Sequence, residues 1–373
     1  MSSKCKWVRL GDYIEECDLR NTELKFGIED VKGMTITKEV IPTKANLEGN
    51  DLSKFKIVMP QEFIYNPRTH GKKIGLGINN SDRPFLISWN NTAFRIKDNK
   101  TLLPLYLYIF VCREEWDRLA CFNSWGSSTE VFSWESLCNM TIPLPSIEEQ
   151  QKIVNAWQSL REVKEQNEAI ATPLMQVCQS YIQELKHKCK KHYRIGNAIR
   201  LFERTNSEGK SYAMLGLNKA KQFMPTVANT KDVDIRKYKI VSKGVFAYSG
   251  MQTGRDICIR IALYNNETPA IISPAYSTFT LDNNQDILSE YFMLLFTRTE
   301  MDRLGWFYSD SSVRSNLDWE RFINIEIPLP PIEVQRAIVN IYNCANEAKH
   351  IAVEADRMSR EVCSALIQHA INN

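Results

Sequence analysis

The sequence contains one stretch twice, and the two copies lie half a chain apart. Residues 142–155 have the sequence IPLPSIEEQQKIVN and residues 327–340 have IPLPPIEVQRAIVN, so 10 of the 14 positions are identical. The copies are 185 positions apart in a chain of 373 residues. A repeat of this period sets the architecture before any single element is considered. The spacing therefore predicts two copies of one folded unit.

The same spacing relates residues along the rest of the chain, so the chain is a tandem duplication. The matched sets are Arg9, Gly11 and Ile14 with Arg194, Gly196 and Ile199, Asp117, Arg118 and Leu119 with Asp302, Arg303 and Leu304, Trp134 and Glu135 with Trp319 and Glu320, and Asn139 with Asn324.

The repeated stretch combines an extended segment with the start of a helix. In the first copy, Pro143 and Pro145 restrict the backbone to extended angles and remove hydrogen-bond donors. Apolar residues then recur at helical spacing, and Glu148 lies in the first turn, where the helix dipole favours an acidic side chain. The second copy repeats this arrangement, so each predicts a strand that ends at the start of a helix.

A heptad pattern follows the prolines in each copy, with steps of three and four residues that are typical of a coiled coil. In the first helix, which extends roughly 40 Å along this pattern at about 1.5 Å per residue, the positions are Ile153, Ala156, Leu160, Val163, Asn167, Ile170, Leu174, Val177 and Tyr181. In the second helix they are Ile338, Ile341, Ala345, Ala348, Ala352, Ala355, Ser359, Val362 and Leu366.

Two features of these helices shape the expected pairing. Small residues fill the middle of the second pattern, and they let two helices approach closely. A whole folded unit separates the helices in the sequence, so the chain has room to return. We therefore expect one intramolecular antiparallel pair. Pro173 lies inside the first helix and is expected to kink or interrupt it at about Ala171 or Thr172.

Each copy begins with a unit of mixed secondary structure. Strand-like alternation occurs at 55–59 (FKIVM) and 93–97 (AFRIK). The apolar run at 102–111 predicts a buried helix that starts after Pro104 and continues to Leu119. The fold class expected is α+β, with boundaries at 1–145 for the first unit, 146–190 for the first helix, 191–330 for the second unit and 331–373 for the second helix.

Three pairs of segments share matched residues at equivalent positions but differ in the loop residues between them. They are 63–75 with 246–258, 86–94 with 271–279, and 125–135 with 310–320. In the first pair, Phe63, Tyr65, Gly71 and Ile74 match Phe246, Tyr248, Gly254 and Ile257.

Polar and basic side chains on such loops suit contacts with DNA base edges and phosphates. Solvated hairpin loops, or neutral drift after the duplication, would give the same pattern, and these alternatives stay open. The candidate DNA-binding residues are Arg68, Thr69, His70, Lys72, Lys73, Trp89, Asn90, Asn91, Ser127, Ser128, Gln252, Thr253, Arg255, Tyr276, Ser312, Arg314 and Asn316.

Composition narrows the function classes. A formal net charge of +3 permits nucleic-acid binding without requiring it. The ten cysteines contain no C-x-x-C pair, which argues against a zinc site and favours scattered buried thiols in a reducing compartment. The N-terminus has no apolar signal core, and no run of about 18 apolar residues occurs. We expect a cytoplasmic chain that does not span a membrane.

Catalytic motifs are missing as well. The GKS at 209–211 lacks the glycine that a phosphate-binding loop needs five residues earlier. YNPR at 65–68 has Arg68 where the Asn-Pro-Pro-aromatic motif of amino-methyltransferases has its second proline. Glu-x-Lys triplets like the one at Glu23 recur in predicted helices, and five histidines offer little acid–base chemistry. We expect no catalytic residue, metal or cofactor in this chain.

A basic run, KHKCKKHYR at 186–194, ends the first helix. Two interpretations remain: favourable interaction with the negative end of the helix dipole, or contact with a DNA backbone.

With IPLP-x-IE-x-Q-x-x-IVN present twice, each time closing an α+β unit and opening a long helix, the chain resembles the specificity subunits of type I restriction-modification enzymes. The resemblance covers nearly the whole chain. It implies two target recognition domains separated by two long helices that pair as an antiparallel coiled coil with pseudo-twofold symmetry. Arg314 and Asn316 resemble a basic–Asn–Leu stretch that precedes the motif in the family, whereas the corresponding stretch of the first copy contains Glu130 and Phe132.

The resemblance also implies a function. Each domain would recognise one half of a bipartite, asymmetric double-stranded DNA site, and the coiled coil would set the spacer. Two modification subunits would carry S-adenosylmethionine, and a restriction subunit would bring ATP hydrolysis with Mg²⁺. The structural or subunit-docking residues would be Pro143, Pro145, Glu148, Gln150, Pro328, Pro330, Glu333 and Gln335.

Two other classes of function remain at this point. A duplicated scaffold or adaptor would bind other proteins through its loops and show no salt-dependent affinity for DNA. An enzyme with an unrecognised site would show turnover by the isolated chain.

Overall fold

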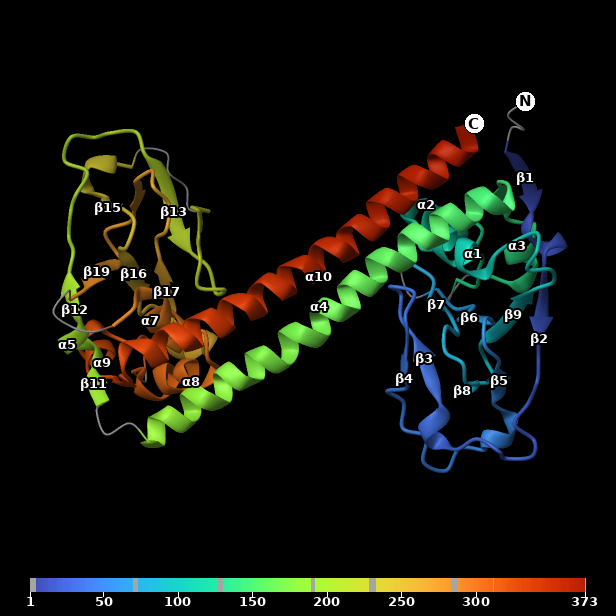
Figure 1. The fold of residues 1–373 in the computed structure, drawn as a ribbon, viewed down its shortest axis with the longest axis horizontal. Helices are drawn as coiled ribbons and strands as arrows, with labels where there is room; N and C mark the ends of the chain where they lie inside the picture. Colours follow the sequence, from blue (N-terminus) through green and yellow to red (C-terminus); the bar gives the residue numbers. More distant parts are fainter. Residues whose placement is uncertain are drawn as a thin grey trace. The chain divides into compact units, whose positions relative to one another are not determined.

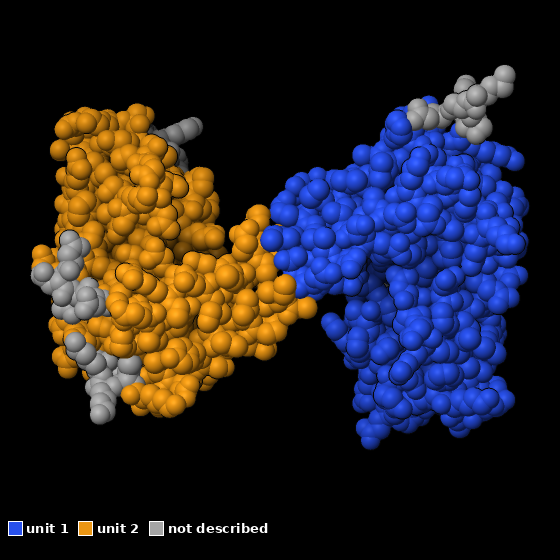
Figure 2. Space-filling model, viewed as in Figure 1, with its two compact units in different colours: residues 1–167, 351–373 blue, residues 168–350 orange. Residues whose placement is uncertain are grey.

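The protein divides into two compact units, and each unit contains part of both long helices. The structure is a computed structural model that describes residues 5–69, 73–126, 130–188, 192–227, 233–282, 287–310 and 312–372. Unit 1 comprises residues 1–167 and 351–373, and unit 2 comprises residues 168–350 (Figure 2). This division cuts each long helix, so it does not test the boundaries expected from the sequence, which stay a prediction.

Unit 1 is built from short strands and three short helices. In chain order its elements are β1 (Lys6–Arg9), η1 (Leu10–Asp12), β2 (Ile14–Cys17), η2 (Ile28–Asp30), β3 (Lys32–Met34), β4 (Val40–Pro42), η3 (Leu52–Lys54), β5 (Lys56–Val58), β6 (Phe63–Tyr65), β7 (Leu76–Ile78), β8 (Phe85–Ile87), β9 (Thr92–Ile96), α1 (Pro104–Val111), α2 (Glu114–Phe122), α3 (Trp134–Asn139) and β10 (Thr141–Leu144).

The centre of unit 1 is an antiparallel sheet with strand order β2-β9-β6-β7. Alternate residues of its strands point to opposite faces. Phe63 and Tyr65 of β6 pack on the helical side with α1, α2 and α3, whereas Ile64 packs on the other side with residues of β5 and β8. Phe63 stacks on Phe94 of β9 with ring centroids 4.9 Å apart. The sheet therefore lies between a layer of helices and a second pair of strands.

The apolar run at 102–111 forms a buried helix that begins at Pro104, as expected. The expected continuation to Leu119 is wrong in one respect, because the helix ends at Val111 and a second helix begins at Glu114. Glu114 and Glu115 lie in the first turn of α2, where the free backbone N–H groups favour acidic side chains. The sequence change from apolar to acidic marks this boundary.

Unit 2 repeats most elements of unit 1, although η2 has no counterpart among the described residues of unit 2. Its elements are β11 (His192–Arg194), α5 (Ile195–Ala198), β12 (Ile199–Leu201), β13 (Ala213–Leu217), β14 (Phe223–Pro225), η4 (Ile235–Lys237), β15 (Lys239–Val241), β16 (Phe246–Ser249), α6 (Thr253–Asp256), β17 (Arg260–Leu263), β18 (Ala270–Ile272), β19 (Ser277–Leu281), α7 (Ser289–Phe296), α8 (Thr299–Tyr308), α9 (Trp319–Ile323) and β20 (Glu326–Pro328).

The second central sheet has the order β12-β19-β16-β17, the counterpart of β2-β9-β6-β7. Phe246 stacks on Phe279 with centroids 5.1 Å apart, which repeats the pair of unit 1. A second sheet, β14-β13-β18-β15, covers the face opposite the helices. Within each unit the short helices lie on the side of the long helices, and the outer strands lie farther away (Figure 1). The expected α+β fold with two repeated units is confirmed.

The repeated stretch forms the join between each unit and its long helix. β10 pairs with β1, and β20 pairs with β11. Each proline lacks a donor but offers its carbonyl oxygen, and in unit 1 both are used. The Tyr106 hydroxyl donates to the carbonyl of Pro143 at 2.9 Å, and the Gln150 Nε2 donates to the carbonyl of Pro145 at 3.0 Å. In unit 2, Tyr291 and Gln335 make the same two bonds to Pro328 and Pro330.

Gln150 connects three segments by its side-chain amide. Its Oε1 accepts from the backbone N–H of Leu103 at 2.9 Å, and its Nε2 donates to the carbonyl of Thr101 at 3.0 Å. Gln335 repeats the first of these bonds with Leu288, at 2.9 Å. Both glutamines are completely buried, so they are structural residues of this join. The four prolines are buried too, whereas Glu148 and Glu333 are exposed.

The long helices are α4 (Ile147–Lys188) and α10 (Ile332–Asn372). In unit 1 the beginning of α4 packs against the end of α10, as Ile153 and Val154 share a core with Cys363 and Ile367. In unit 2 the end of α4 packs against the beginning of α10, where Ile182 shares a core with Ile338 and Val339. The helices are therefore antiparallel, as expected. In the part of the chain that is described, no helix is long and apolar enough to cross a membrane.

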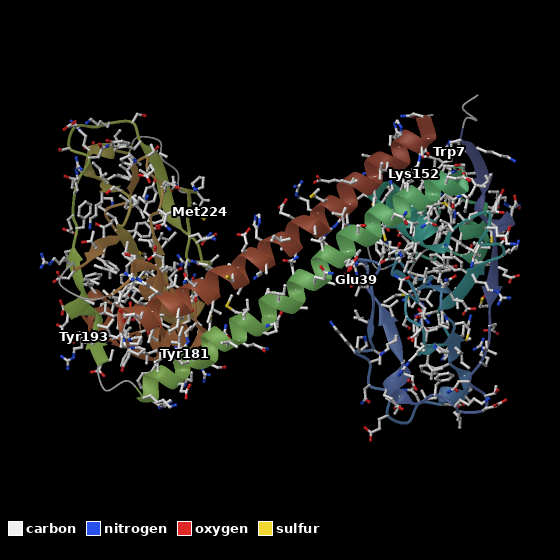
Figure 3. The ribbon with its side chains drawn as sticks, in the orientation of Figure 1. Trp7, Glu39, Lys152, Tyr181, Tyr193 and Met224 are labelled. Carbon is white, nitrogen blue, oxygen red and sulfur yellow. The ribbon has the colours of Figure 1, made fainter. Side chains whose placement is uncertain are left out.

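The expected seam is correct for most of α10 and partly wrong for α4. Near the end of α10 the buried residues are Cys363 and Ile367, whereas the expected Val362 and Leu366 are half-buried, as is Ile341. Ile338, Ala345, Ala348, Ala352, Ala355 and Ser359 are buried in α10 as expected. In α4, Ile170 and Val177 are each 51% exposed. Tyr181, near the end of α4 (Figure 3), is 41% exposed. The buried residues are instead Ala171, Cys178 and Ile182, one position later. A straight helix of 3.6 residues per turn drifts by about 20° per heptad, so a strict heptad count loses the buried face after a few turns.

Pro173 does not interrupt α4, which contradicts that part of the expectation. The missing N–H of Pro173 leaves the carbonyl of Ala169 without its helical partner. Both residues are exposed, so water can bond to this carbonyl. Ala171 and Cys178 hold the other side of the helix in a buried position. Packing on the buried side and solvation on the exposed side together allow the helix to continue.

The described cysteines are free, and Cys178, Cys258 and Cys363 are buried, as the sequence led us to expect. Cys112 and Cys344 are exposed, and Cys5, Cys17, Cys121 and Cys138 are half-buried, so the expectation of buried thiols is confirmed for only three of the described cysteines. Burial raises the pKa of Cys363 to about 11, which makes this thiol a poor nucleophile at neutral pH.

Replacing Gln150 by alanine is expected to destabilise unit 1 by roughly 2–3 kcal/mol, because the N–H of Leu103 and two carbonyl groups lose their partner. Urea unfolding measures this change. Gln151→Ala is the matched control, since Gln151 is exposed and bonds only to Asn155 one turn away. Equal destabilisation by both variants would contradict the structural role of Gln150.

An ion pair between the long helices in unit 1 predicts a pH dependence. Lys164 donates to Asp356 at 2.9 Å, and Arg360 also pairs with this carboxylate. Burial acts to raise the pKa of Asp356, but hydrogen bonds from Lys164 and Arg360 outweigh it and lower the pKa. A depressed folded-state pKa means that the stabilisation is present above the unfolded pKa of about 4 and is lost as the pH falls through the folded value.

Asp356→Asn is therefore expected to lower the free energy of unfolding by about 1 kcal/mol at neutral pH, and the difference from wild type should shrink in acid. Urea unfolding at several pH values measures it. Glu361→Gln removes an exposed ion pair with Arg357 on the same helix and serves as the control. A difference for Asp356→Asn that persists unchanged at low pH would show that the ion pair is not its cause.

Candidate nucleic-acid interface

Three of the segments singled out in the sequence meet at one end of the central sheet in unit 1. Tyr65, the last residue of β6, lies opposite Thr92, the first residue of β9. The loop that follows β6 and the turn that precedes β9 therefore leave the same end of the sheet. The third segment joins them, because Thr69 N–H donates to the Glu130 carbonyl at 3.0 Å and Phe132 N–H donates to the Pro67 carbonyl at 2.7 Å.

Unit 2 brings its three segments together in the same way. Tyr248 of β16 lies opposite Ser277 of β19, so the loop after β16 and the turn before β19 leave one end of the sheet. The Gly254 N–H donates to the Ser315 carbonyl at 2.8 Å, and the Leu317 N–H donates to the Gly250 carbonyl at 2.9 Å. Residues that are 60 or more positions apart thus form one surface.

The expected DNA-binding residues differ in how they face this surface. Most of the charged ones are exposed, together with several polar ones. The exposed residues are Arg68, Lys73, Trp89, Asn90, Arg255, Ser312 and Arg314. Gln252, Tyr276 and Asn316 are half-buried, and Thr69, Asn91 and Thr253 are buried. His70, Lys72, Ser127 and Ser128 lie outside the described residues. The assignment of these residues to DNA contact stays a prediction.

Several of the less exposed residues hold the loops in shape. The Thr69 hydroxyl donates to the Glu130 carbonyl at 3.1 Å, and the Thr253 hydroxyl donates to the Gly250 carbonyl at 3.1 Å. Asn316 Oδ1 accepts from the Gln252 N–H at 2.9 Å, which connects two segments. These contacts use the donor of each threonine hydroxyl and the acceptor of the Asn316 side chain. The placement therefore favours the exposed basic residues as the ones that face a ligand.

Two glycines allow the loop of unit 2 to lie against the third segment. A Cβ atom at Gly250 would stand 1.7 Å from the carbonyl oxygen of Leu317, and one at Gly254 would stand 2.0 Å from the Ser315 hydroxyl oxygen. Neither distance leaves room for a side chain. The close approach of the two segments thus depends on glycine at both positions.

The structure corrects one alignment made from the sequence. Gly71 and Ile74 were matched with Gly254 and Ile257, at an offset of 183. The strand register places Leu76 opposite Tyr65 and Ile261 opposite Tyr248, so Leu76 corresponds to Ile261, at an offset of 185. The loop at 66–75 is therefore two residues shorter than its counterpart at 249–260. The matched glycine and isoleucine hid this insertion.

Sequence reasoning missed the exposed aromatic residues beside the loops. Trp125 is 75% exposed and pairs through its backbone with Val131, which also pairs with Arg68. Phe122 and Phe307 are exposed at equivalent positions near the ends of α2 and α8. Aromatic side chains next to basic ones suit stacking on bases as well as phosphate contact. The sequence did contain a signal for two of them: Phe122 and Phe307 lie at or near the ends of helices whose sequences also contain several charged residues.

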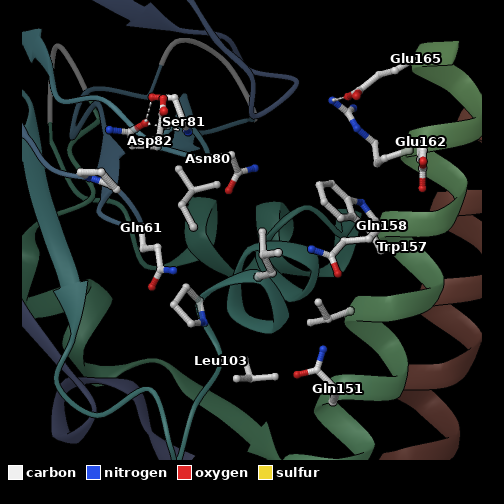
Figure 4. A pocket seen from close by; sticks show the side chains of 17 residues that line it. Gln61, Asn80, Ser81, Asp82, Leu103, Gln151, Trp157, Gln158, Glu162 and Glu165 are labelled. Carbon is white, nitrogen blue, oxygen red and sulfur yellow. Dashed lines mark hydrogen bonds and ion pairs between the residues drawn. The ribbon is translucent and has the colours of Figure 1, made fainter.

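A groove lies between the strands of unit 1 and the first half of α4 (Figure 4). Trp157 and Gln158 of α4 face the turn around Asn80, and Arg161, which pairs with Glu165, also lines the groove. Its volume is about 770 Å³. Unit 2 has a groove of about 350 Å³ at the equivalent place, where Tyr342 and Asn343 take the positions of Trp157 and Gln158. Aromatic and amide groups in an open groove suit packing against a protein surface.

Comparisons with known proteins agree with the repeated architecture. A family model described as type I restriction modification DNA specificity domain matches residues 44–172 and 228–343. A crystal structure of the S subunit of a type I restriction-modification system from M. genitalium shares the fold, with a TM-score of 0.64, 13% sequence identity, and coverage of 99% of this chain and 97% of that chain. No curated protein sequence matches this chain.

Two further solved structures align over nearly the full length but with lower scores. The HsdS subunit from Thermoanaerobacter tengcongensis has a TM-score of 0.38 at 18% identity, over 99% of this chain and 96% of that one. A structure described as the structural basis of complex assembly and conformational transition of the type I R-M system has a TM-score of 0.46 at 16% identity, over 100% and 98%. The two matches to the family model together span well over half of the chain. The chain therefore belongs to the type I restriction-modification DNA specificity family, as a specificity subunit that carries the domain twice.

Proposed function

We propose that each unit of this chain recognises one half of a split, asymmetric double-stranded DNA site. The observation that carries the proposal is the pair of sheet ends, which share one frame and differ in the side chains they expose. Unit 1 presents Arg68, Lys73 and Trp89, and unit 2 presents Arg255 and Arg314. Guanidinium and ammonium groups contact phosphates and guanine edges. Two different sets of such groups support two different half-sites.

We also propose that the long helices keep the two half-sites a fixed distance apart on the duplex. Two DNA-binding units in one chain gain affinity because the second contact becomes intramolecular. That gain depends on a connection whose length matches the separation of the half-sites. Helices of 42 and 41 residues, paired antiparallel at both ends, supply a stiff connection. A longer or shorter helix pair would select a different spacer.

Catalysis is assigned to partner subunits in this proposal. Two modification subunits would supply S-adenosylmethionine and methyl transfer, and a restriction subunit would supply ATP- and Mg²⁺-dependent cleavage. Equivalent grooves beside Trp157 and Tyr342 support two copies of one partner. The repeated prolines and glutamines are buried, so they would act by holding the helices in place. Glu148 and Glu333 are exposed and remain candidates for direct docking.

Methylation mapping is the first test of this proposal. Cells carrying the chain with its modification subunit are compared with cells from which the chain is deleted, and a split sequence motif should lose its methylation on deletion. The reconstituted complex should also bind that motif with an affinity that falls at least about a hundredfold between about 50 and 200 mM salt. An unchanged methylation pattern together with salt-independent protein binding would instead support a scaffold that binds proteins through its loops.

Exchange of the interlocking segments tests the assignment of loops to half-sites. Residues 66–75 and 125–131 are replaced together by residues 249–260 and 310–316, since each pair is joined by backbone hydrogen bonds. The half of the motif recognised by unit 1 should change, and the other half should be retained. Lys243→Ala is the control, because Lys243 is exposed at the opposite end of β16. Retention of both half-sites would exclude these segments as the determinants.

A further inference from the structure

Each unit contains a lysine with a buried side chain whose ammonium group bonds to the end of the loop that follows the central strand. This loop, residues 66–75 in unit 1 and 249–260 in unit 2, is called the recognition loop below. In unit 1, Lys38 lies between β3 and β4, and its Nζ donates to Asp117 of α2 at 2.5 Å and to the carbonyl of Ile74 at 2.7 Å. The side chains of Lys38 and Asp117 are only 3% and 8% exposed. Ile74 stands two residues before β7, at the point where the loop returns to the sheet. The lysine thus joins a turn, a helix and the loop end.

Unit 2 contains the same arrangement. Lys221, between β13 and β14, donates to Asp302 of α8 at 2.7 Å and to the carbonyl of Ile259 at 2.7 Å. Asp302 also accepts from the backbone N–H of Ile259 at 2.8 Å. The carboxylate and the ammonium group therefore hold both backbone groups of the same loop residue. Lys221 is 7% exposed, so this contact lies inside the unit.

The buried lysine–aspartate pair is energetically costly, for two reasons. Lys38 and Lys221 both have left-handed backbone angles, with φ of 67° and 61°, which lysine adopts at a cost. A buried ion pair also loses the hydration of two charges, and apolar residues of similar volume often stabilise a fold as well. Both copies nevertheless have the pair. Its geometry satisfies a loop carbonyl that an apolar side chain would leave unpaired.

The ion pair connects the helix and strand turn that both units share to the recognition loop, whose length differs between the units. The loop of unit 2 is two residues longer than that of unit 1, yet the distance from the lysine Nζ to the loop carbonyl is 2.7 Å in both. The aspartate lies on the helix that leads into the third recognition segment, since α2 precedes residues 125–131 and α8 precedes residues 309–316. One ion pair thus positions two of the three segments relative to the sheet.

We propose that Lys38 with Asp117, and Lys221 with Asp302, are positioning residues that determine how sharply each unit discriminates its own DNA half-site. The inference rests on the proposed function, because it assigns the loops to DNA recognition. The ion pair does not touch DNA. It fixes the loop end within the unit, and base discrimination depends on donors and acceptors held within a fraction of an ångström.

The test uses the full complex with its modification subunits and the double variant Lys221→Met/Asp302→Asn. This variant leaves no unpaired charge, and the asparagine Oδ1 still accepts from the Ile259 N–H. Binding is measured to duplexes with the cognate motif and to duplexes with one base pair changed in either half-site. Discrimination in the half-site of unit 2 should fall roughly tenfold, the loss expected for one displaced base contact. Discrimination in the other half-site should stay unchanged.

The duplication supplies matched controls. Lys38→Met/Asp117→Asn should reverse the pattern and weaken discrimination in the half-site of unit 1 alone. Lys243→Met removes a lysine of unit 2 whose ion pair with Glu267 is exposed, and discrimination should remain at the wild-type level. Thermal unfolding of each variant reports whether its unit is folded.

Two outcomes would overturn the inference: a folded double variant with wild-type discrimination in both half-sites, or equal loss in both. A wild-type complex that binds no split motif would instead overturn the proposed function itself, so the two failures are distinguishable. Wild-type binding with a one-sided loss in each double variant supports the positioning role.

Discussion

The hydrogen bonds of a buried glutamine side chain join each unit to its long helix. Gln150 lies three residues into α4 and bonds to the segment before α1 and to the carbonyl of Pro145. The two prolines hold the preceding chain extended, and their carbonyl oxygens accept from Tyr106 and Gln150. These bonds fix the direction in which α4 continues from the extended segment. The second copy reproduces these bonds with Gln335, Tyr291 and its own prolines.

Much of this architecture could be predicted from the sequence, because a duplication records the same physical constraint twice. The prolines, the glutamine and the apolar positions of α10 were all recognisable, and the antiparallel pairing followed from the length of the chain between the helices. The seam of α4 was harder. Lys164 stands at a half-buried position, while Val163 and Ile170 are exposed, so hydrophobicity alone selected the wrong face. The face is determined by the partner helix and its small residues.

The candidate site was predicted as three separate segments, and the structure shows why they form one surface. Antiparallel pairing of β6 with β9 places two loop attachments at one end of the sheet, and this register is not encoded in any single segment. The ion pairs of Lys38 and Lys221 were not anticipated. Asp117 and Asp302 were visible as repeated residues, but their partners lie 79 and 81 positions earlier, at a slightly different offset. The two lysines are 183 positions apart and the two aspartates 185, because the loop between them is two residues longer in unit 2.

Under the proposed function, the glycines at 250 and 254 have a consequence for how such a chain acquires new targets. With Cβ positions 1.7 and 2.0 Å from atoms of the facing segment, the loop and residues 315–317 interlock. A change of shape in one segment alone would collide with the other, so gradual substitution along a single loop meets a steric barrier. Inheritance of both segments together avoids it. Gene exchange that brings in a loop together with its matched facing segment, as replacement of a whole unit would, is a route to a new specificity that this interlock leaves open.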